Sequence, residues 1–343
     1  MTISARPRRG IALSGALLSA TLLLAGCSGS SGPGETQDTK GKGPGAGTYP
    51  VTIDTAYGEI TLKERPERIV ALGRQSNYVD MLAAIGVEPV AFAVDGAPDE
   101  AALLASYPWF EGLTTAEFDP KMITAEQKAW PEAIAEHDPD LILGDIWGID
   151  EQLYGQLSQI APAYVGVDKD AVTGWKDHLT ALGALTGHPD EASQVVSDIE
   201  GQLSTARDRL SGLQGKTYNF GVVLEGMFRF GGATFPDDLG LVPAENQGTP
   251  TGTTHESLSL ENLDQLQADV LLIGVFADPD ARSGLEADPR FAELPASKNG
   301  TVVFIDRQLA NASGSTPGPA SLAWLLERVV PQLAASRLNG SGR

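Results

Sequence analysis

Short apolar runs alternate along this chain with longer stretches in which apolar residues recur every three or four positions. Short runs predict buried strands, and the longer stretches predict amphipathic helices that cover them. The first half of the pattern predicts strands at 68–72, 89–94, 140–144 and 163–167, and helices at 77–85, 131–137, 152–160 and 175–186. Alternation of this kind favours a mostly parallel sheet with helices on both faces.

The longest helical pattern lies near the middle of the folded region, at 190–213. Val195, Ile199 and Leu203 lie on one face of it, and His188-Pro189-Asp190 is typical of a helix start. A second series follows, with strands at 217–224, 228–231, 270–274 and 301–305 and helices at 237–239, 259–266 and 319–335. We therefore expect an α/β protein with two Rossmann-like lobes, 49–187 and 215–343, joined by one long connecting helix at 188–214.

One spacing occurs once in each series. Glu132 is followed eight residues later by Asp140 and the run LILG, and Glu261 is followed eight residues later by Asp269 and the run VLLIG. Each copy predicts a short helix that leads into a buried strand. The repeat indicates two similar lobes, each with one carboxylate on a matching outer surface.

The first residues have the pattern of a secretory signal. Arg6, Arg8 and Arg9 precede an apolar run at 11–24 that is too short to span a bilayer, and small residues follow it. Leu24-Ala25-Gly26-Cys27 resembles the lipobox of bacterial lipoproteins, in which the cysteine is acylated after cleavage; the alternative is an ordinary signal with a chance cysteine. We expect a signal peptide at 1–26, lipidation of Cys27, and a flexible tether to residue 48.

Charge and composition exclude several classes of function. The formal net charge is −21, and loss of three signal-peptide arginines makes it −24, which argues against nucleic acid as a partner. The four histidines are scattered, so we expect solvated or capping roles for them and no metal site. We find no nucleophile elbow, no P-loop and no dinucleotide fingerprint, and therefore expect a binding protein without resident cofactor rather than an enzyme.

Three segments together resemble one known family. The segments RPERIVAL, PEAIAEHDPDLIL and SLENLDQLQADVLLI, in this order and spacing, resemble the substrate-binding lipoproteins of ATP-binding-cassette importers for iron–siderophores, a group that also serves haem and cobalamin. The resemblance implies a ligand cleft between two lobes, and it implies that Glu132 and Glu261 engage arginines of the membrane permease. An acid in a first helical turn can also simply complement the helix dipole.

The expected function follows from this resemblance. We expect a lipid-anchored monomer on the extracytoplasmic face of the cell membrane that captures a ferric siderophore and delivers it to the permease. Haem or cobalamin are the alternative ligands within the same group.

Candidate ligand-binding residues were sought just after the predicted strands, where open α/β sheets bind ligands. They are Arg74, Tyr78, Trp147, Arg229 and Arg307. Guanidinium groups bind the oxygens of carboxylates, hydroxamates or catecholates, and aromatic faces cover an apolar rim. The arginines could instead pair with acids and Trp147 could be core, as could Trp109, Trp175, Phe228 and Phe230. The sequence leaves open whether the chelate is charged or near-neutral.

Overall fold

The computed structural model describes residues 47–73, 78–171, 173–248, 256–278, 280–314 and 316–340. The expected signal peptide, Cys27, most of the tether, Arg74 and His255 lie outside these ranges. Within them, no helix is long and apolar enough to cross a membrane.

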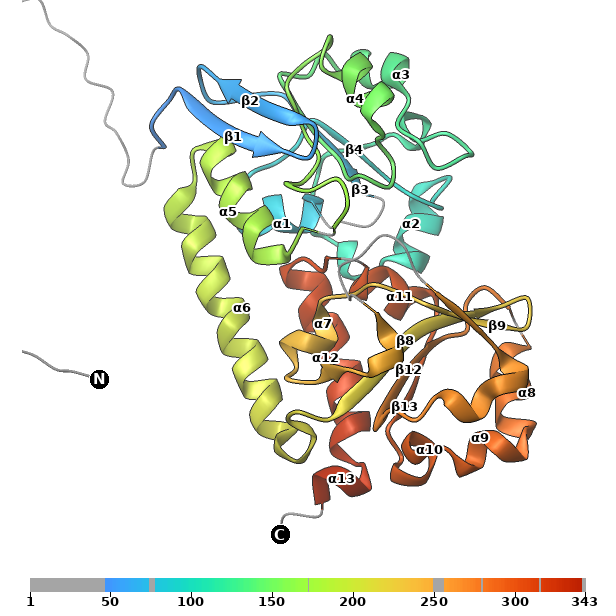
Figure 1. The fold of residues 1–343 in the computed structure, drawn as a ribbon. Helices are drawn as coiled ribbons and strands as arrows, with labels where there is room; N and C mark the ends of the chain where they lie inside the picture. The colour runs from blue at the N-terminus through green and yellow to red at the C-terminus, as the bar shows by residue number, and fades with distance from the viewer. Residues whose placement is uncertain are drawn as a thin grey trace, which may run out of the picture. The chain divides into compact units, whose positions relative to one another are not determined.

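The N-terminal lobe is built on a five-stranded parallel sheet with the order β5-β4-β3-β6-β7 (Figure 1). The strands are β3 Ile69–Gly73, β4 Ala91–Val94, β5 Glu117–Phe118, β6 Leu141–Leu143 and β7 Ala163–Tyr164. An antiparallel hairpin of β1 Val51–Thr55 and β2 Gly58–Leu62 precedes them. Because the strand order reverses beside β3, the carboxyl ends of β3, β4 and β6 face the position where such sheets bind ligands.

Helices of this lobe connect the strands in the expected order. They are α1 Tyr78–Ala84, α2 Glu100–Ser106, α3 Pro131–Ala135, α4 Glu151–Leu157 and α5 Trp175–Thr186, with the 3₁₀ turns η1 Pro108–Phe110 and η2 Pro120–Met122. All the helices predicted for this half are present, but α2 and the two-residue strand β5 were not predicted.

The C-terminal lobe contains a six-stranded mixed sheet. Its main order is β11-β9-β8-β12-β13, and β10 also pairs with β8. The strands are β8 Thr217–Leu224, β9 Met227–Phe230, β10 Val242–Pro243, β11 Ser257–Ser259, β12 Val270–Gly274 and β13 Val302–Ile305. Strands β8, β10, β12 and β13 are parallel, whereas β9 and β11 are antiparallel to their neighbours. The sheet is therefore parallel only in part.

Most helices of this lobe lie after β12. They are α8 Ala281–Ala287, α9 Pro289–Glu293, α10 Pro295–Asn299, α11 Arg307–Ser313, α12 Pro319–Ala334 and α13 Arg337–Gly340; α7 Phe235–Asp238, η3 Ser211–Leu213, η4 Glu245–Gln247 and η5 Leu260–Gln265 come earlier. The α-helix expected at 259–266 is instead the 3₁₀ segment η5, which is kinked at Asn262, where the backbone angles are not helical. Ser259 nevertheless caps it, accepting a hydrogen bond from the Glu261 amide.

The expected long helix is α6, Pro189–Arg209, with 21 residues. At about 1.5 Å per residue it is roughly 31 Å long, and Figure 1 shows it running alongside both lobes. It ends earlier than predicted because the chain tightens into the 3₁₀ turn η3. Its buried face carries Ala192, Ile199, Leu203 and Ala206.

The repeat in the sequence corresponds to the same local structure in each lobe. The Asp140 carboxylate accepts the backbone N–H of Glu67 and of Arg68, at 2.7 and 2.8 Å, just before β3. The Asp269 carboxylate accepts the backbone N–H of Thr217, at 3.1 Å, at the start of β8. In both lobes the aspartate therefore fixes the register between two parallel strands. These are β3 and β6 in the N-terminal lobe and β8 and β12 in the C-terminal lobe.

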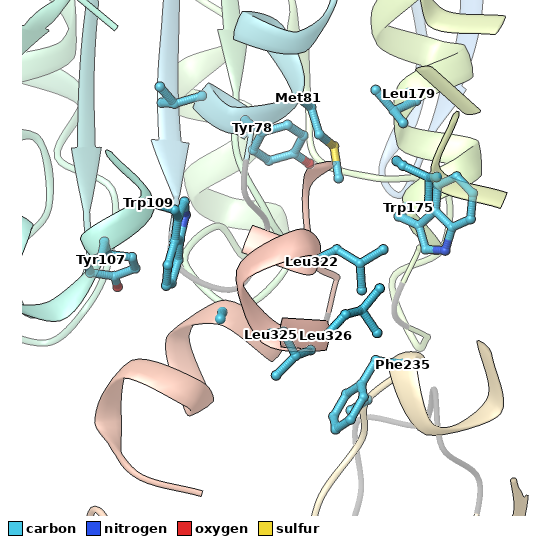
Figure 2. Packing of buried hydrophobic residues seen from close by; sticks show 14 of the residues in the cluster. Tyr78, Met81, Tyr107, Trp109, Trp175, Leu179, Phe235, Leu322, Leu325 and Leu326 are labelled. Atoms are coloured by element: carbon cyan, nitrogen blue, oxygen red, sulfur yellow. The ribbon is translucent and has the colours of Figure 1, made fainter. Parts of the chain in front are cut away.

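One hydrophobic core is shared by the two lobes, and each sheet has a further core on its outer face. Figure 2 shows the shared core, in which Tyr78 and Met81 of α1 and Trp175 of α5 gather near Leu322 of α12 and Phe235 of α7. Trp109 packs on Trp324 with ring centroids 5.5 Å apart. Separation of the lobes would expose this apolar surface to water, which is unfavourable. Trp109, Trp175, Phe228 and Phe230 all lie in cores.

A buried carboxylate joins the lobes within this core. Asp80, on α1, is 1% exposed. Its two oxygens accept the backbone N–H of Ala320 and of Ser321, each at 2.8 Å, so it caps the first turn of α12. The approach requires glycine at position 318, because a Cβ there would lie 2.6 Å from Asp80 Oδ2. Burial raises the pKa of Asp80 to about 6, although both N–H donors favour the carboxylate.

His178 corrects one expectation, because it is neither solvated nor capping. It is 2% exposed in the shared core, and its Nδ1 lies 3.1 Å from the Tyr164 hydroxyl. Burial lowers its pKa to about 3, so the imidazole is neutral in the folded protein. Of the others, His188 precedes α6 and contacts Arg65, and His137 lies 3.1 Å from Asp119.

Loss of the Asp80 carboxylate should destabilise the fold more than loss of an exposed helix cap. Asp80→Ala leaves two buried N–H groups unpaired, at about 1–3 kcal/mol each. Asp150→Ala removes a cap from α4 in an exposed position and should cost about 1 kcal/mol. Urea unfolding of the two variants measures the difference. Equal losses of unfolding free energy in the two variants would contradict the view that the Asp80 carboxylate holds the two lobes together.

The buried neutral His178 should make the fold sensitive to acid. Unfolding exposes the imidazole, whose pKa returns to about 6.5. Between about pH 6.5 and pH 3 the unfolded chain thus binds more protons, and stability falls as pH falls, by at most about 1.4 kcal/mol per pH unit from this group. Urea unfolding from pH 7 to 4 should show a shallower loss in His178→Gln than in His188→Gln. Parallel curves for these two variants would show that His178 contributes no such dependence.

Candidate functional site

A cavity of about 490 Å³ lies between the lobes, at the carboxyl ends of both sheets. Its lining within the described chain is Asp95, Gly96, Ser106, Tyr107 and Gln127 from the N-terminal lobe and Phe276, Arg307, Ala310, Asn311 and Gly314 from the C-terminal lobe. This volume lies in the range of small-molecule sites. The cleft expected between the lobes is therefore present.

The N-terminal wall is organised around Asp95, which directly follows β4. The Tyr107 hydroxyl donates to the backbone oxygen of Asp95 at 3.0 Å, and Gln127 Nε2 donates to its carboxylate at 2.7 Å. Gln127 holds a left-handed backbone conformation, with φ of 63°. These bonds hold together polar groups from three separate segments of the N-terminal lobe.

The C-terminal wall carries an arginine stacked on an aromatic ring. Arg307 begins α11 after β13, and its guanidinium carbon lies 4.6 Å from the centroid of Phe276, which follows β12. Asp306 caps α11 by accepting the Leu309 N–H at 2.8 Å. Stacking holds the planar guanidinium against the ring, and Arg307 Nη2 donates to the Phe276 backbone oxygen at 3.5 Å. The remaining N–H groups of a guanidinium can bind further oxygens.

The electrostatic environment of the cavity is mixed in sign. The pKa of Tyr107 is raised, first by burial and then by the negative charges of Asp95 and Asp145, whereas Arg307 acts in the opposite direction. Asp145 is 5% exposed and accepts the backbone N–H of Trp147 and of Gly148. Tyr107 therefore remains a neutral hydroxyl at physiological pH.

Two amide side chains of α11 cross from one lobe to the other beside the cavity. Gln308 Nε2 donates to the Ala105 oxygen at 2.8 Å, and Asn311 Nδ2 donates to the Ser106 oxygen at 3.0 Å. Both acceptors belong to the last turn of α2, where helix carbonyls lack intrahelical partners. The C-terminal lobe thus caps α2 of the N-terminal lobe. Asp80 makes the reciprocal contact, because it belongs to the N-terminal lobe and caps α12 of the C-terminal lobe.

The structure brings one predicted ligand-binding residue, Arg307, to the cavity. Tyr78 has no exposed surface, and its hydroxyl donates to the Gly144 oxygen at 2.6 Å, so in this arrangement it supports the end of β6 rather than facing the cavity. Arg229 is on β9 and pairs with Glu225 at 2.7 Å. Trp147 is partly buried and, like Arg229, is outside the cavity lining. Arg74 lies outside the described residues.

The sequence reasoning missed most of the lining. Asp95 and Phe276 each follow a predicted strand, so the rule that selected Arg307 applies equally to them. Tyr107, Gln127 and Asn311 lie on segments with no predicted element, and no pattern in the sequence points to them. Within the described part of the chain, there is no group of three or more histidine, cysteine or acidic side chains that could hold a metal ion.

Glu132 and Glu261 occupy comparable places in the two lobes. Each is exposed, and each lies in the first turn of the short helix that precedes a repeated strand: Glu132 in α3 before β6, and Glu261 in η5 before β12. Trp130, two residues before Glu132, is 45% exposed. In the other lobe, Arg290 donates to the Glu261 backbone oxygen at 2.6 Å and so fixes the start of η5.

Comparison with known proteins identifies the family. A family model described as periplasmic binding protein matches residues 69–309. The probable siderophore-binding lipoprotein YfiY of Bacillus subtilis is 26% identical over 87% of this chain and 90% of its own length, and the Fe(3+)-citrate-binding protein YfmC of the same organism is 22% identical over 87% and 89%.

A solved structure shows the same fold. PiaA of Streptococcus pneumoniae in complex with ferrichrome superposes with a TM-score of 0.66, at 25% identity, over 82% of this chain and 97% of its own. Because the family model covers well over half of the chain, and because the two-lobed architecture agrees with it, the chain belongs to the periplasmic binding protein family.

Proposed function

We propose that this protein captures a ferric siderophore outside the cell membrane and delivers it to the permease of an ATP-binding-cassette importer, without chemistry on the ligand. The observation that carries the proposal is the cavity between the lobes, which Tyr107 lines from the N-terminal lobe and Arg307 lines from the C-terminal lobe. A guanidinium donor suits the oxygen-rich surface of an iron chelate. The names of the relatives support iron chelates as the ligand class.

The membrane location in this proposal rests on the N-terminal sequence. Cys27 would carry the lipid anchor, and residues up to 48 would tether the lobes to the membrane surface. Stable anchoring needs more than one acyl chain, which lipoprotein processing would have to provide at this cysteine.

Glu132 and Glu261 are the proposed contacts to the permease. A carboxylate forms a directional, two-pronged contact with a guanidinium, so a pair of them sets the orientation of the docked protein more than its affinity. Exposed Trp130 adds an aromatic surface beside Glu132, and tryptophan is enriched at interface hot spots. Around Glu261 the surface is hollowed, and its lining carries Glu225, Asp278, Asp280 and Asp288 together with one base, Arg290, which pairs with Asp288. A basic permease surface would complement both places.

Haem or cobalamin remain the alternative ligands. Haem iron is usually held by an axial histidine, tyrosine, methionine or cysteine. Of these residue types, the cavity lining in the described chain offers only Tyr107, whose hydroxyl already donates to Asp95. The wall is therefore better suited to a chelate that brings its own iron ligands.

The proposal separates ligand capture from docking, and a pair of double variants tests this. Glu132→Gln with Glu261→Gln should bind ferric siderophore like wild type, measured by tryptophan fluorescence quenching, yet lower iron uptake tenfold or more in cells that lack the wild-type copy. The loss is expected because both guanidinium contacts to the permease are removed.

The matched control is Glu136→Gln with Asp264→Asn, which changes two exposed acids at the C-cap of α3 and within η5, and it should support normal uptake. Wild-type protein that quenches with no ferric siderophore would refute capture. Normal uptake by the Glu132 and Glu261 double variant would refute the docking role alone.

A further inference from the structure

A second hollow, of about 480 Å³, lies on the N-terminal lobe between α2 and the edge strand β5. Segments of β4, α2, η1 and β5 contribute to its lining. Among the described residues, it shares none of its lining with the cavity between the lobes. This hollow, which we call the α2 groove, is therefore a separate feature of the surface.

Apolar side chains line much of the α2 groove. The centroid of the Phe92 ring lies 5.8 Å from that of Phe110 and 5.3 Å from that of Phe118. Leu104, which also lines the groove, is 37% exposed, and it is one of four large apolar residues exposed to this extent in the described chain. An exposed leucine beside an aromatic hollow favours contact with an apolar group of a partner.

The rim of the α2 groove is acidic. Asp99, Glu100 and Glu111 are exposed members of its lining, and the described lining includes no basic residue. The structure describes the whole stretch 92–120, whose sequence contains six acids and no lysine, arginine or histidine. This composition favours a basic partner over an anionic lipid surface or a second copy of this acidic chain.

Strand β5 gives the α2 groove a backbone edge. The backbone N–H groups of Glu117 and Asp119 donate to β4, at 3.3 and 2.9 Å. Phe118 lies between them, so its own N–H and C=O are directed away from β4, at the outer edge of the sheet. Backbone groups at a sheet edge can pair with an extended segment of another chain. The groove therefore suits a polypeptide.

The α2 groove is connected to the surface around Glu132 through η2. Pro120, at the start of η2, lines the groove, and the oxygen of Met122, at its end, accepts the Trp130 N–H at 2.9 Å. Trp130 is 45% exposed and is another of the four exposed large apolar residues. In Figure 1, α2 and α3 both lie at the right of the N-terminal lobe. The groove thus adjoins the surface proposed to face the permease.

We infer that the α2 groove binds a basic polypeptide segment of the importer permease. An apolar side chain of this segment contacts Leu104, and its basic side chains lie beside Glu100 and Glu111. This inference rests on the proposed function, and it adds a contact of substantial area to the two carboxylates already proposed. A groove of this kind anchors an interface through one buried side chain, whereas exposed carboxylates mainly set orientation.

The first test is photochemical crosslinking of the full chain in cells that produce it together with the importer. Leu104 is replaced by the photoreactive residue p-benzoylphenylalanine, and crosslinked products are identified by mass spectrometry. We expect a crosslink to the permease. The matched control places the same residue at Val242, which is 42% exposed and lies where β10 pairs with the first residues of β8, and it should give no crosslink to the permease.

The second test reverses the charge of the rim. Glu100→Lys with Glu111→Lys should lower iron uptake at least about tenfold in cells that lack the wild-type copy, because basic groups would then repel each other. The matched control, Asp198→Lys with Asp208→Lys, makes the same change of charge at exposed positions of α6 and should support normal uptake. Thermal unfolding and quenching by ferric siderophore should be unchanged in both double variants.

A third comparison isolates the apolar contact. Leu104→Ser should also lower uptake at least about tenfold, since truncation of an interface anchor has an effect of this size. Val242→Ser removes a similarly exposed apolar side chain and should not lower it.

The outcomes separate the groove from the proposed function. A Leu104 crosslink only to lipid or to a second copy of this chain would overturn the inference. Normal uptake by the Glu100 and Glu111 double variant, or an equal loss in its α6 control, would also overturn it, and ferric-siderophore capture would stand. Absence of quenching of the wild-type protein by any ferric siderophore would remove the proposed function and this inference together.

Discussion

The bond between the Asp80 carboxylate and the first turn of α12 is the contact on which the relation of the two lobes depends. It joins residues 240 positions apart in the chain, and it lies in a core that α1, α5 and α12 share. A carboxylate without solvent is stable only with its donors in place, and the Ser321 donor is buried while the Ala320 donor is partly buried. Parting the lobes at this point would leave the carboxylate and these donors without one another.

At the edge of the cavity the two lobes are joined by weaker contacts. There Gln308 and Asn311 bond to the end of α2 through neutral amides, and the Gln308 bond is at the surface. Neutral hydrogen bonds of this kind contribute about 0.5–1.5 kcal/mol each. These ties at the cavity edge are therefore weaker than the contact of the buried Asp80 carboxylate within the shared core.

Much of the fold could be predicted from the sequence, because apolar spacing and helix capping depend on residues that are close together in the chain. The runs that become β8 and β12, the helices α5 and α12, and the Ser259 cap all follow from apolar spacing and capping chemistry. The spacing from glutamate to aspartate marked both lobes, since Asp140 and Asp269 perform the same bonding at equivalent strand starts. Strand β9 was predicted without its antiparallel direction, because pairing direction depends on segments distant in sequence, and β11 was not predicted.

Fewer residues of the candidate site could be predicted from the sequence. Arg307 was found by its position after a strand, and Asp95 and Phe276 obey the same rule. Gln127 depends on a left-handed turn and Asn311 on a helix without strong periodicity, while Tyr78 proved buried. We propose that an iron chelate occupies the space between Asp95, Tyr107 and Arg307. The decisive experiment is a crystal structure of the complex with ferrichrome, with iron located by anomalous scattering. We expect one iron site in this cavity, and iron bound elsewhere on the protein would refute the proposal.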